Sequence, residues 1–438
     1  RIWIWSLIWG CLLILNPCTE AWASNFGDTY GFSVQGIGMG NAVTAIVDDW
    51  SAVYYNIAGL GRTRHRKPDI AGRPPRLNDL AVTLLMTRPN FNIDIQRQGI
   101  VGDKNLDFGA FVLGVAFDLN QIYTMPAIVS SARLGVGLQG FGFASASYIN
   151  AVNYARQRVQ GTDLTKIFDK DPQPVAIINH PDVRRQLVHM KAYVDGMRAL
   201  MYYTALCFDK VLTAADDTEK DMHQGLIELL IPVVKGYITD RAFEVCTQGV
   251  QVYGGYGFIR EYPQEQLLRD CKITSIYEGT NGIQAMDLLG RKLGLKKGKP
   301  FMDLLTQMNQ TIAAAKEIPG LEEMAIWLEK AVNKLGETAM HMGMTAMSEK
   351  ALDAFAVAQP FLDVTGDVVM GWLELWRAVV AQPKIDTARK KDAAFYLGQV
   401  KTAQYFIQWV LPATLGKMDA LQGNIPAIME MPDAAFAG

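Results

Sequence analysis

The sequence predicts a mainly α-helical fold: a four-helix bundle with a C-terminal helical extension, preceded by a short, incomplete β segment. Apolar residues alternate with a period of two before about residue 125, as in strands, and recur at spacings of three and four after it, as in helices. Glycines cluster in the first third of the chain, in GFSVQGIGMGN and IAGLG, whereas the last third reads as one helix after another. Two compositions in one chain suggest two parts of different origin that meet near residue 130.

Composition and charge limit the possible functions. With 438 residues, 50% hydrophobic and 20% charged, the chain is long enough for roughly two or three domains, and wholesale disorder is excluded. Lys and Arg number 42 against 44 Asp and Glu, so a net charge of −2 gives no basic field to attract nucleic acid. The five histidines have no ligand spacing, so no metal site is predicted, and neither a Walker loop nor a G-x-S-x-G motif is present.

Residues 1–23 have the pattern of a secretory signal peptide. Arg1 precedes an apolar stretch, and Ala21 and Ala23 form an A-x-A cleavage site. A membrane anchor is the alternative, but the apolar stretch is short and Pro17 interrupts it. The pattern therefore favours export or the outer membrane.

The cysteines indicate a different compartment. Cleavage after Ala23 would leave Cys207, Cys246 and Cys271, none of them in a C-x-x-C pair. Their apolar surroundings predict buried free thiols, which are typical of a reducing compartment such as the cytoplasm. The predicted localisation is thus conflicting.

Residues 24–130 are predicted to form the β segment. Apolar residues alternate from Phe111 to Leu119, which predicts a strand, and a second strand is expected between Leu80 and Ile95. Pro89 should lie at a turn or a sheet edge, because proline cannot donate to a ladder. The charged run RTRHRKPDIAGRPPR is expected to be a solvated loop.

The segment GFSVQGIGMGNAVTAIVDDWSAVYYNIAGLG, following a signal peptide, resembles the N-terminus of the long-chain fatty-acid transporters of the bacterial outer membrane. That family usually has proline where this chain has Ile57, and the resemblance ends near residue 130. A membrane barrel must close to pair its backbone groups, and roughly a hundred residues supply only a few strands. Transport by this chain alone is therefore not expected.

Helical periodicity dominates residues 131–297, the predicted bundle. Helices are expected over 132–160, from Pro181 onward, over 218–253, and after Thr280. The helix from Pro181 carries one apolar stripe of Val183, Leu187, Met190, Val194, Met197, Met201, Ala205 and Phe208. Gly254 and Gly255 should end the third helix, and the Thr280 hydroxyl can cap the fourth. Residues 298–438 form the extension, helical to about residue 415, with its methionines in the core.

Glu278 is the one residue that the sequence singles out for chemistry. It lies in IYEGTNGIQ at the start of a helix, where free N–H groups and a flexible glycine can present a carboxylate to a pocket. For an arbitrary glutamate, a solvated capping residue is the alternative. The GGYG run follows a helix rather than a strand, so by itself it is a helix stop and not a nucleotide loop.

Five segments of the predicted bundle, taken in order, match the pattern of a known protein family. They are ARLGVGLQG, YARQRVQG, HPDVRRQLVHMKAY, VQVYGGYGFIREYPQEQLLRD and ITSIYEGTNGIQAMDLLGRKL. Together they resemble the C-terminal helical bundle of the acyl-CoA dehydrogenases, and the extension resembles the longer subfamily that includes methylthiopropanoyl-CoA dehydrogenase.

The resemblance implies FAD-dependent α,β-dehydrogenation of an acyl-CoA thioester. Glu278 would remove the α-proton while a hydride leaves the β carbon for the flavin, which requires a desolvated carboxylate and hydrogen bonds to the developing enolate. The resemblance further implies contacts to FAD from Arg158, which would hold the pyrophosphate of a neighbouring subunit's cofactor, and from Gln251, Gly254, Gly255 and Thr280. Arg133 would lie near the acyl-CoA. Gly282 departs from the glutamine of several relatives, so that contact is not expected.

The resemblance also implies a homo-oligomer formed through the bundle and an electron-transfer flavoprotein as partner. Acyl-CoA dehydrogenases begin with a helical domain and a middle β domain that cover the flavin, whereas this chain has the signal and the β segment at that place. We therefore expect a fusion, or a misassembled reading frame, joined between residues 129 and 137, with little or no turnover. The alternatives are an outer-membrane fatty-acid transporter fragment and a non-catalytic fusion.

Overall fold

A computed structural model describes residues 79–87, 90–91, 104–105, 108–116, 125–277, 279–423 and 425–436. The chain forms two compact units that divide between Pro126 and Ala127, and each is described by itself. The predicted signal peptide, the expected charged loop and Pro89 lie outside the described residues.

The N-terminal unit contains two antiparallel strand pairs. Strand β1 (Asp79–Thr87) pairs with β4 (Phe108–Ala116), and β2 (Asn90–Phe91) pairs with β3 (Lys104–Asn105). Both predicted strands are confirmed. The one expected between Leu80 and Ile95 lies at Asp79–Thr87, and the one predicted over Phe111–Leu119 lies three residues earlier, at Phe108–Ala116. The transporter resemblance stays a prediction, because a two-stranded ladder is common to many folds.

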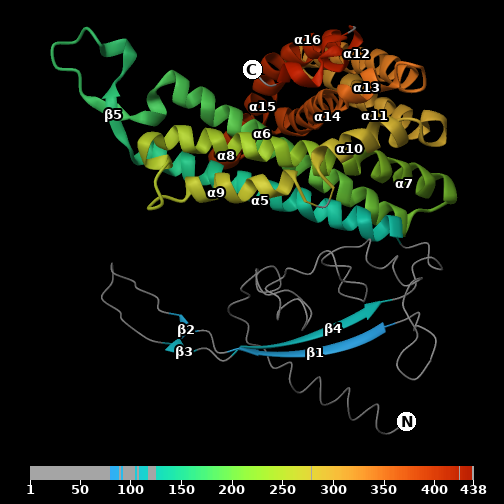
Figure 1. The fold of residues 1–438 in the computed structure, drawn as a ribbon. Coiled ribbons are helices and arrows are strands. Elements are labelled where there is room, and N and C mark those ends of the chain that lie inside the picture. The colour runs from blue at the N-terminus through green and yellow to red at the C-terminus, as the bar shows by residue number, and fades with distance from the viewer. Residues whose placement is uncertain are drawn as a thin grey trace. The chain divides into compact units, whose positions relative to one another are not determined.

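The second unit begins with the helices of the bundle, which Figure 1 shows as long, closely packed rods. They are α5 (Met125–Gln157), α6 (Pro181–Thr213), α7 (Asp217–Pro232), α8 (Ile238–Tyr253), α9 (Gln264–Cys271) and α10 (Asn281–Asp287). Between α5 and α6 the chain forms a hairpin of β5 (Val159–Thr162) and β6 (Pro174–Ala176), which projects from one end of the bundle (Figure 1). The predicted bundle is confirmed, with α9 and the hairpin as additions.

Helix α6 begins at Pro181 as predicted, and the middle of its apolar stripe is buried. Leu187, Met190, Val194, Met197 and Met201 are each less than a tenth exposed. A proline fits the first turn of a helix because its missing N–H would have no intrahelical partner there. Spacing alone was therefore enough to find the buried face of this helix.

The predicted helix over 218–253 is interrupted. Pro232 has no N–H to give to the carbonyl four residues earlier, and the segment after it, Val233–Tyr237, widens into a π-helical turn. The second half, α8, ends at Gly254, whose φ of 59° lies in the left-handed region that favours glycine. The predicted stop is confirmed.

The extension is helical throughout most of its length. Its helices are α11 (Lys299–Lys316), α12 (Glu322–Ala346), α13 (Ala351–Ala356), α14 (Ala358–Ala381), α15 (Lys390–Tyr405), α16 (Leu411–Gln422) and α17 (Ala427–Glu430). Helix α14 is buried along most of its length and packs against α6, α11, α12, α15 and α16. The prediction that the extension's methionines lie in the core is confirmed for five of them, Met308, Met324, Met342, Met370 and Met418. It was wrong for six others, which are exposed: Met302, Met340, Met344, Met347, Met429 and Met431.

A buried polar link joins the bundle to the extension in their common core. The Tyr237 hydroxyl donates to Asp367 Oδ1 (2.6 Å), and the Thr414 hydroxyl donates to Asp367 Oδ2 (2.8 Å). A buried carboxylate is costly unless it is hydrogen-bonded, so these two donors hold α14 against both the bundle and α16.

The three cysteines of the bundle are free and buried, as predicted. In the described part of the chain, none of the helices is both long enough and apolar enough to cross a membrane.

Candidate active site

Glu278 itself lies outside the described residues, but both flanks of it are described. Before it, the Tyr277 hydroxyl donates to the side-chain oxygen of Gln139 on α5. After it, Gly279 has φ 84°, a left-handed conformation that side chains rarely adopt. Thr280 then begins α10 as its N-cap residue. The segment around Glu278 is therefore fixed on both sides, to α5 and to α10.

Asn281 holds the start of α10 against the π-helical turn. Its Oδ1 accepts from Lys235 Nζ (2.9 Å), and its Nδ2 donates to the carbonyl of Gly236 (3.0 Å) and to the hydroxyl of Thr239 (2.9 Å). Lys235 is completely buried, and Asn281 nearly so. Buried polar groups that are fully bonded make an arrangement unique, so this network fixes the position of α10.

Sequence reasoning missed Lys235 and Asn281. A signal for Lys235 was present, because it is a single cation in the apolar run LLIPVVKGYI. A helix that is apolar on all sides is buried, so its one lysine must be buried too and needs a hydrogen-bond partner. Asn281 gave no comparable signal, because asparagine is common at helix starts.

Thr280 takes the predicted N-cap position, but its hydroxyl makes no capping bond. The first turn is stabilised by other groups: the Thr280 carbonyl accepts from the N–H groups of Ile283 (2.8 Å) and Gln284 (3.1 Å), and Gln284 Nε2 donates to the carbonyl of Gly279 (3.3 Å). The predicted hydroxyl cap was therefore wrong, and the exposed hydroxyl can serve another partner.

Arg133 lies mostly buried on α5 and forms an ion pair with Asp287 at the end of α10 (3.0 Å). Asp287 also accepts from Arg291 (2.7 Å). The structure places Arg133 close to α10, with its charge already paired. A bound anion would have to share Arg133 with Asp287.

Arg158 and the glycine loop form a second group. The Arg158 guanidinium lies 5.3 Å from the centre of the Tyr256 ring, within the turn Gly254–Gly257. A Cβ added at Gly254 or Gly255 would meet no atom within 4 Å, so open space lies in front of this backbone. Gln251 is exposed in the last turn of α8 before the loop. The structure brings these predicted residues together.

The second group suits a phosphate ligand. Arg158 is exposed and, among the described residues, has no acidic side chain within 4 Å. An arginine and an unobstructed glycine backbone are the donors that bind phosphate oxygens well. The residues present therefore fit the pyrophosphate of a dinucleotide.

The two groups lie at opposite ends of α8. Thr239, which contacts Asn281, and Gln251 are twelve residues apart in the chain. At 1.5 Å per residue the helix separates them by about 18 Å. Within one copy of the chain, Arg158 and Thr280 are therefore not brought to one place.

Comparison with known proteins identifies the helical region. Residues 123–293 match the family "Acyl-CoA dehydrogenase, C-terminal domain", and residues 304–432 match "Acetyl-CoA dehydrogenase C-terminal like". The helical part of the chain belongs to the acyl-CoA dehydrogenase family. The predicted fold class and family of this part are thereby confirmed.

Two characterised members of the acyl-CoA dehydrogenase family show the extent of the match. The broad-specificity linear acyl-CoA dehydrogenase FadE5 of Mycobacterium tuberculosis is 32% identical over 372 residues, which cover 83% of this chain and 61% of the relative. The 3-methylmercaptopropionyl-CoA dehydrogenase of Ruegeria pomeroyi is 37% identical over 292 residues, which cover 65% of this chain and 47% of the relative. The chain therefore spans less than two thirds of the length of these relatives.

A solved structure shares the fold of the acyl-CoA dehydrogenase region. The Caenorhabditis elegans protein ACDH-11, crystallised in complex with C11-CoA, superposes with a TM-score of 0.54 at 17% identity. The superposition covers 68% of this chain and 46% of that one.

Proposed function

We propose that this chain provides the helical half of an FAD-dependent acyl-CoA dehydrogenase site, with Glu278 as the base that removes the α-proton of an acyl-CoA. The observation that carries the proposal is the anchoring of the Glu278 segment. Tyr277 bonds to α5 on one side, and the Lys235–Asn281 network fixes α10 on the other. The family match of residues 123–293 supports it.

The anchoring explains what the chain's own residues contribute to proton removal. A carboxylate can remove a proton from so weak a carbon acid as the α carbon of a thioester only when the carboxylate is fixed in position and water is excluded from it. The bonds at Asn281 hold the start of α10, so the backbone that follows Glu278 does not have to be ordered at each turnover. Gly279 provides the backbone turn that a bulkier residue would strain.

The cofactor would be held by two groups of residues. We propose that Arg158, Gln251, Gly254 and Gly255 bind the phosphate region, and that Thr280 binds another part of FAD through its exposed hydroxyl. FAD, when bound, would accept the hydride from the β carbon of the substrate.

The separation of about 18 Å between these groups along α8 supports a homo-oligomer. We propose that the Arg158 group of one copy and the Thr280 group of another hold the same cofactor. An electron-transfer flavoprotein would then reoxidise the site.

The test is the visible spectrum of the purified full chain, with and without added FAD. We expect flavin absorbance to co-purify or to be restored by FAD, and partial bleaching when an acyl-CoA is added without oxygen. Glu278→Gln should keep the flavin and lose the bleaching, whereas the exposed Glu261→Gln should behave as wild type. A protein that stays colourless with excess FAD contradicts the proposal.

A second comparison tests the cofactor residues. Arg158→Gln should weaken FAD binding by about tenfold, the value of one lost charge-assisted bond. Arg184→Gln removes the same charge from an exposed position on α6 and should change nothing. Equal affinities in both variants would exclude Arg158 from the site.

A further inference from the structure

Two adjoining cavities open between the bundle and the extension, on residues that the proposed catalytic site does not use. One of about 390 Å³ lies between α6, α14 and α15, and the other of about 490 Å³ reaches α5. They share the lining residues Ala199, Tyr202, Arg377, Phe395 and Gln399. They therefore form one groove, here called the α6–α15 groove, with a volume in the range of about 300–1,000 Å³ that is usual for small-molecule sites.

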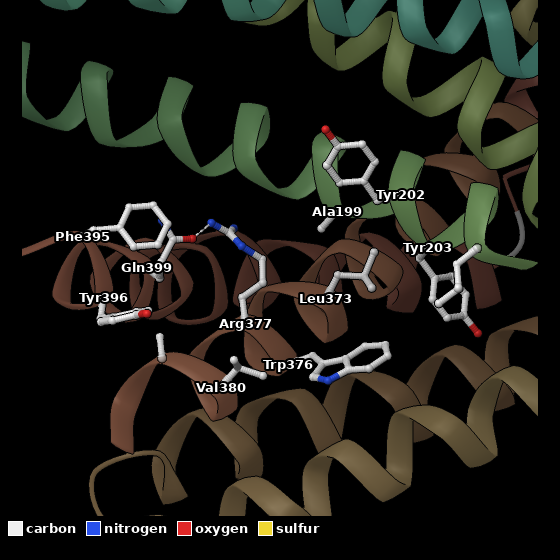
Figure 2. Close-up of a pocket in the computed structure, with 12 residues that line it drawn as sticks. Ala199, Tyr202, Tyr203, Leu373, Trp376, Arg377, Val380, Phe395, Tyr396 and Gln399 are labelled. Carbon is white, nitrogen blue, oxygen red and sulfur yellow. Dashed lines mark hydrogen bonds between the residues drawn. The ribbon is translucent and has the colours of Figure 1, made fainter. Parts of the chain in front are cut away.

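One end of the α6–α15 groove is apolar. Figure 2 shows Tyr202 on α6, Trp376 and Val380 on α14, and Phe395 on α15 around this space. Tyr202 is 70% exposed and Phe395 60%. Large apolar side chains gathered in a concave space, rather than scattered singly, mark a site that an apolar partner covers.

The other end is cationic. Asp195 accepts from Lys191 (2.5 Å), Arg198 (2.9 Å) and Arg377 (3.0 Å), and all four line the larger cavity. Although burial acts to raise it, the pKa of Asp195 is lowered, because Arg377 and Lys191 favour the ionised form. Three cations therefore surround one carboxylate, which leaves positive charge in excess.

Glu374 does not cancel this excess at neutral pH. Its carboxylate accepts from Arg377 Nη1 (2.6 Å), but complete burial raises the pKa of Glu374 to about 8. The carboxyl group is thus largely protonated near pH 7. Arg198 is 40% exposed, so part of its five N–H donors faces the groove.

The α6–α15 groove is separate from the predicted catalytic segment. Gln139, which binds Tyr277, and Tyr148, which lines the groove, are nine residues apart on α5. Nine residues are two and a half turns of an α-helix, so the two side chains leave α5 on opposite sides. A ligand in the groove would not occupy the place proposed for the substrate thioester.

We propose that the α6–α15 groove binds a free medium-chain fatty carboxylate, with the acyl chain against Tyr202, Trp376 and Phe395 and the carboxylate on Arg198 and Lys191. The tail accounts for the exposed apolar side chains, and a monoanionic head matches the excess positive charge. A neutral or cationic head would leave that charge unpaired in a partly buried place.

The test is calorimetric titration of the full chain with dodecanoate and with dodecyltrimethylammonium, which have the same tail and opposite head charge. We expect one dodecanoate per chain and at least tenfold weaker binding of the cation, as the loss of one charge-assisted contact gives. Arg198→Gln should weaken dodecanoate about tenfold without affecting the cation, and Arg198→Lys should restore most of the affinity. Phe395→Ser should weaken both amphiphiles.

Two surface variants serve as matched controls. Lys210→Gln removes a cation from an exposed site on α6 outside the groove, and Leu212→Ser removes an exposed apolar side chain there. Neither should change the affinity for dodecanoate. The proposal is overturned if no dodecanoate binds below about 1 mM, if both amphiphiles bind equally, or if Arg198→Gln and Phe395→Ser match their controls. None of these readings needs flavin, so they are independent of the proposed dehydrogenase activity.

Discussion

The substitution Asn281→Ala tests the network that fixes the predicted catalytic segment. It removes one acceptor of the buried Lys235 ammonium and the two bonds that Asn281 Nδ2 donates to the π-helical turn and to Thr239. It does not disfavour the helical conformation of α10 itself, because alanine is a good helix former.

The size of the effect follows from these three bonds. A hydrogen bond to a charged group contributes about 1.5–3 kcal/mol and a neutral one about 1 kcal/mol. Their sum predicts that the free energy of unfolding falls by about 3.5–5 kcal/mol. The loss is large because Lys235 is completely buried and water cannot replace the missing acceptor.

Urea unfolding followed by circular dichroism at 222 nm would measure the change. Asn309→Ala is the matched control: Asn309 is exposed on α11, so its removal should alter the stability by less than about 0.5 kcal/mol. If Asn281→Ala is as stable as this control, the Lys235–Asn281 network does not hold α10, and the argument for a fixed Glu278 segment fails.

Two further predictions concern the core and its titration. In Gly366→Ala the new Cβ would lie 2.2 Å from Cδ2 of the Tyr237 ring, so thermal unfolding should show a stability lower by about 1–3 kcal/mol. The control is Gly416→Ala, at an exposed helical position with free space around it, which should raise the stability by up to about 1 kcal/mol. Equal effects of the two substitutions would contradict this packing. Burial raises the pKa of Glu374 from 4.5 to about 8, so the folded protein keeps a proton that the unfolded chain has released, and wild-type stability should fall as the pH rises from about 4.5 to 8. Urea unfolding at several pH values would measure this fall in stability. Glu374→Gln should remove the part of the fall that Glu374 causes, whereas the exposed Glu349→Gln should leave it unchanged. Parallel stability profiles for all three proteins would show that Glu374 does not titrate in this range.

Local features were predictable from the sequence. The stripe on α6, the start at Pro181 and the stop at Gly254 depend on residues within a few turns of one another, and the structure confirms them. The π-helical turn after Pro232 was missed, because periodicity in a window of this length does not register one extra residue per turn. The Thr280 hydroxyl cap was wrong, since a favourable residue type does not guarantee that its side chain takes the capping geometry.

The sequence by itself determined the change from strands to helices near residue 130, the helical bundle, and the family resemblance of its five segments. Only the tertiary structure decided that Arg158 lies over Tyr256, that Lys235 binds Asn281, and that three cations meet at Asp195 beside an apolar groove. The physical reason is range: helix periodicity and caps are set by neighbours within about four residues, whereas these contacts depend on how helices distant in the chain pack. The same packing separates the Arg158 and Thr280 groups along α8, which no spacing in the sequence could show.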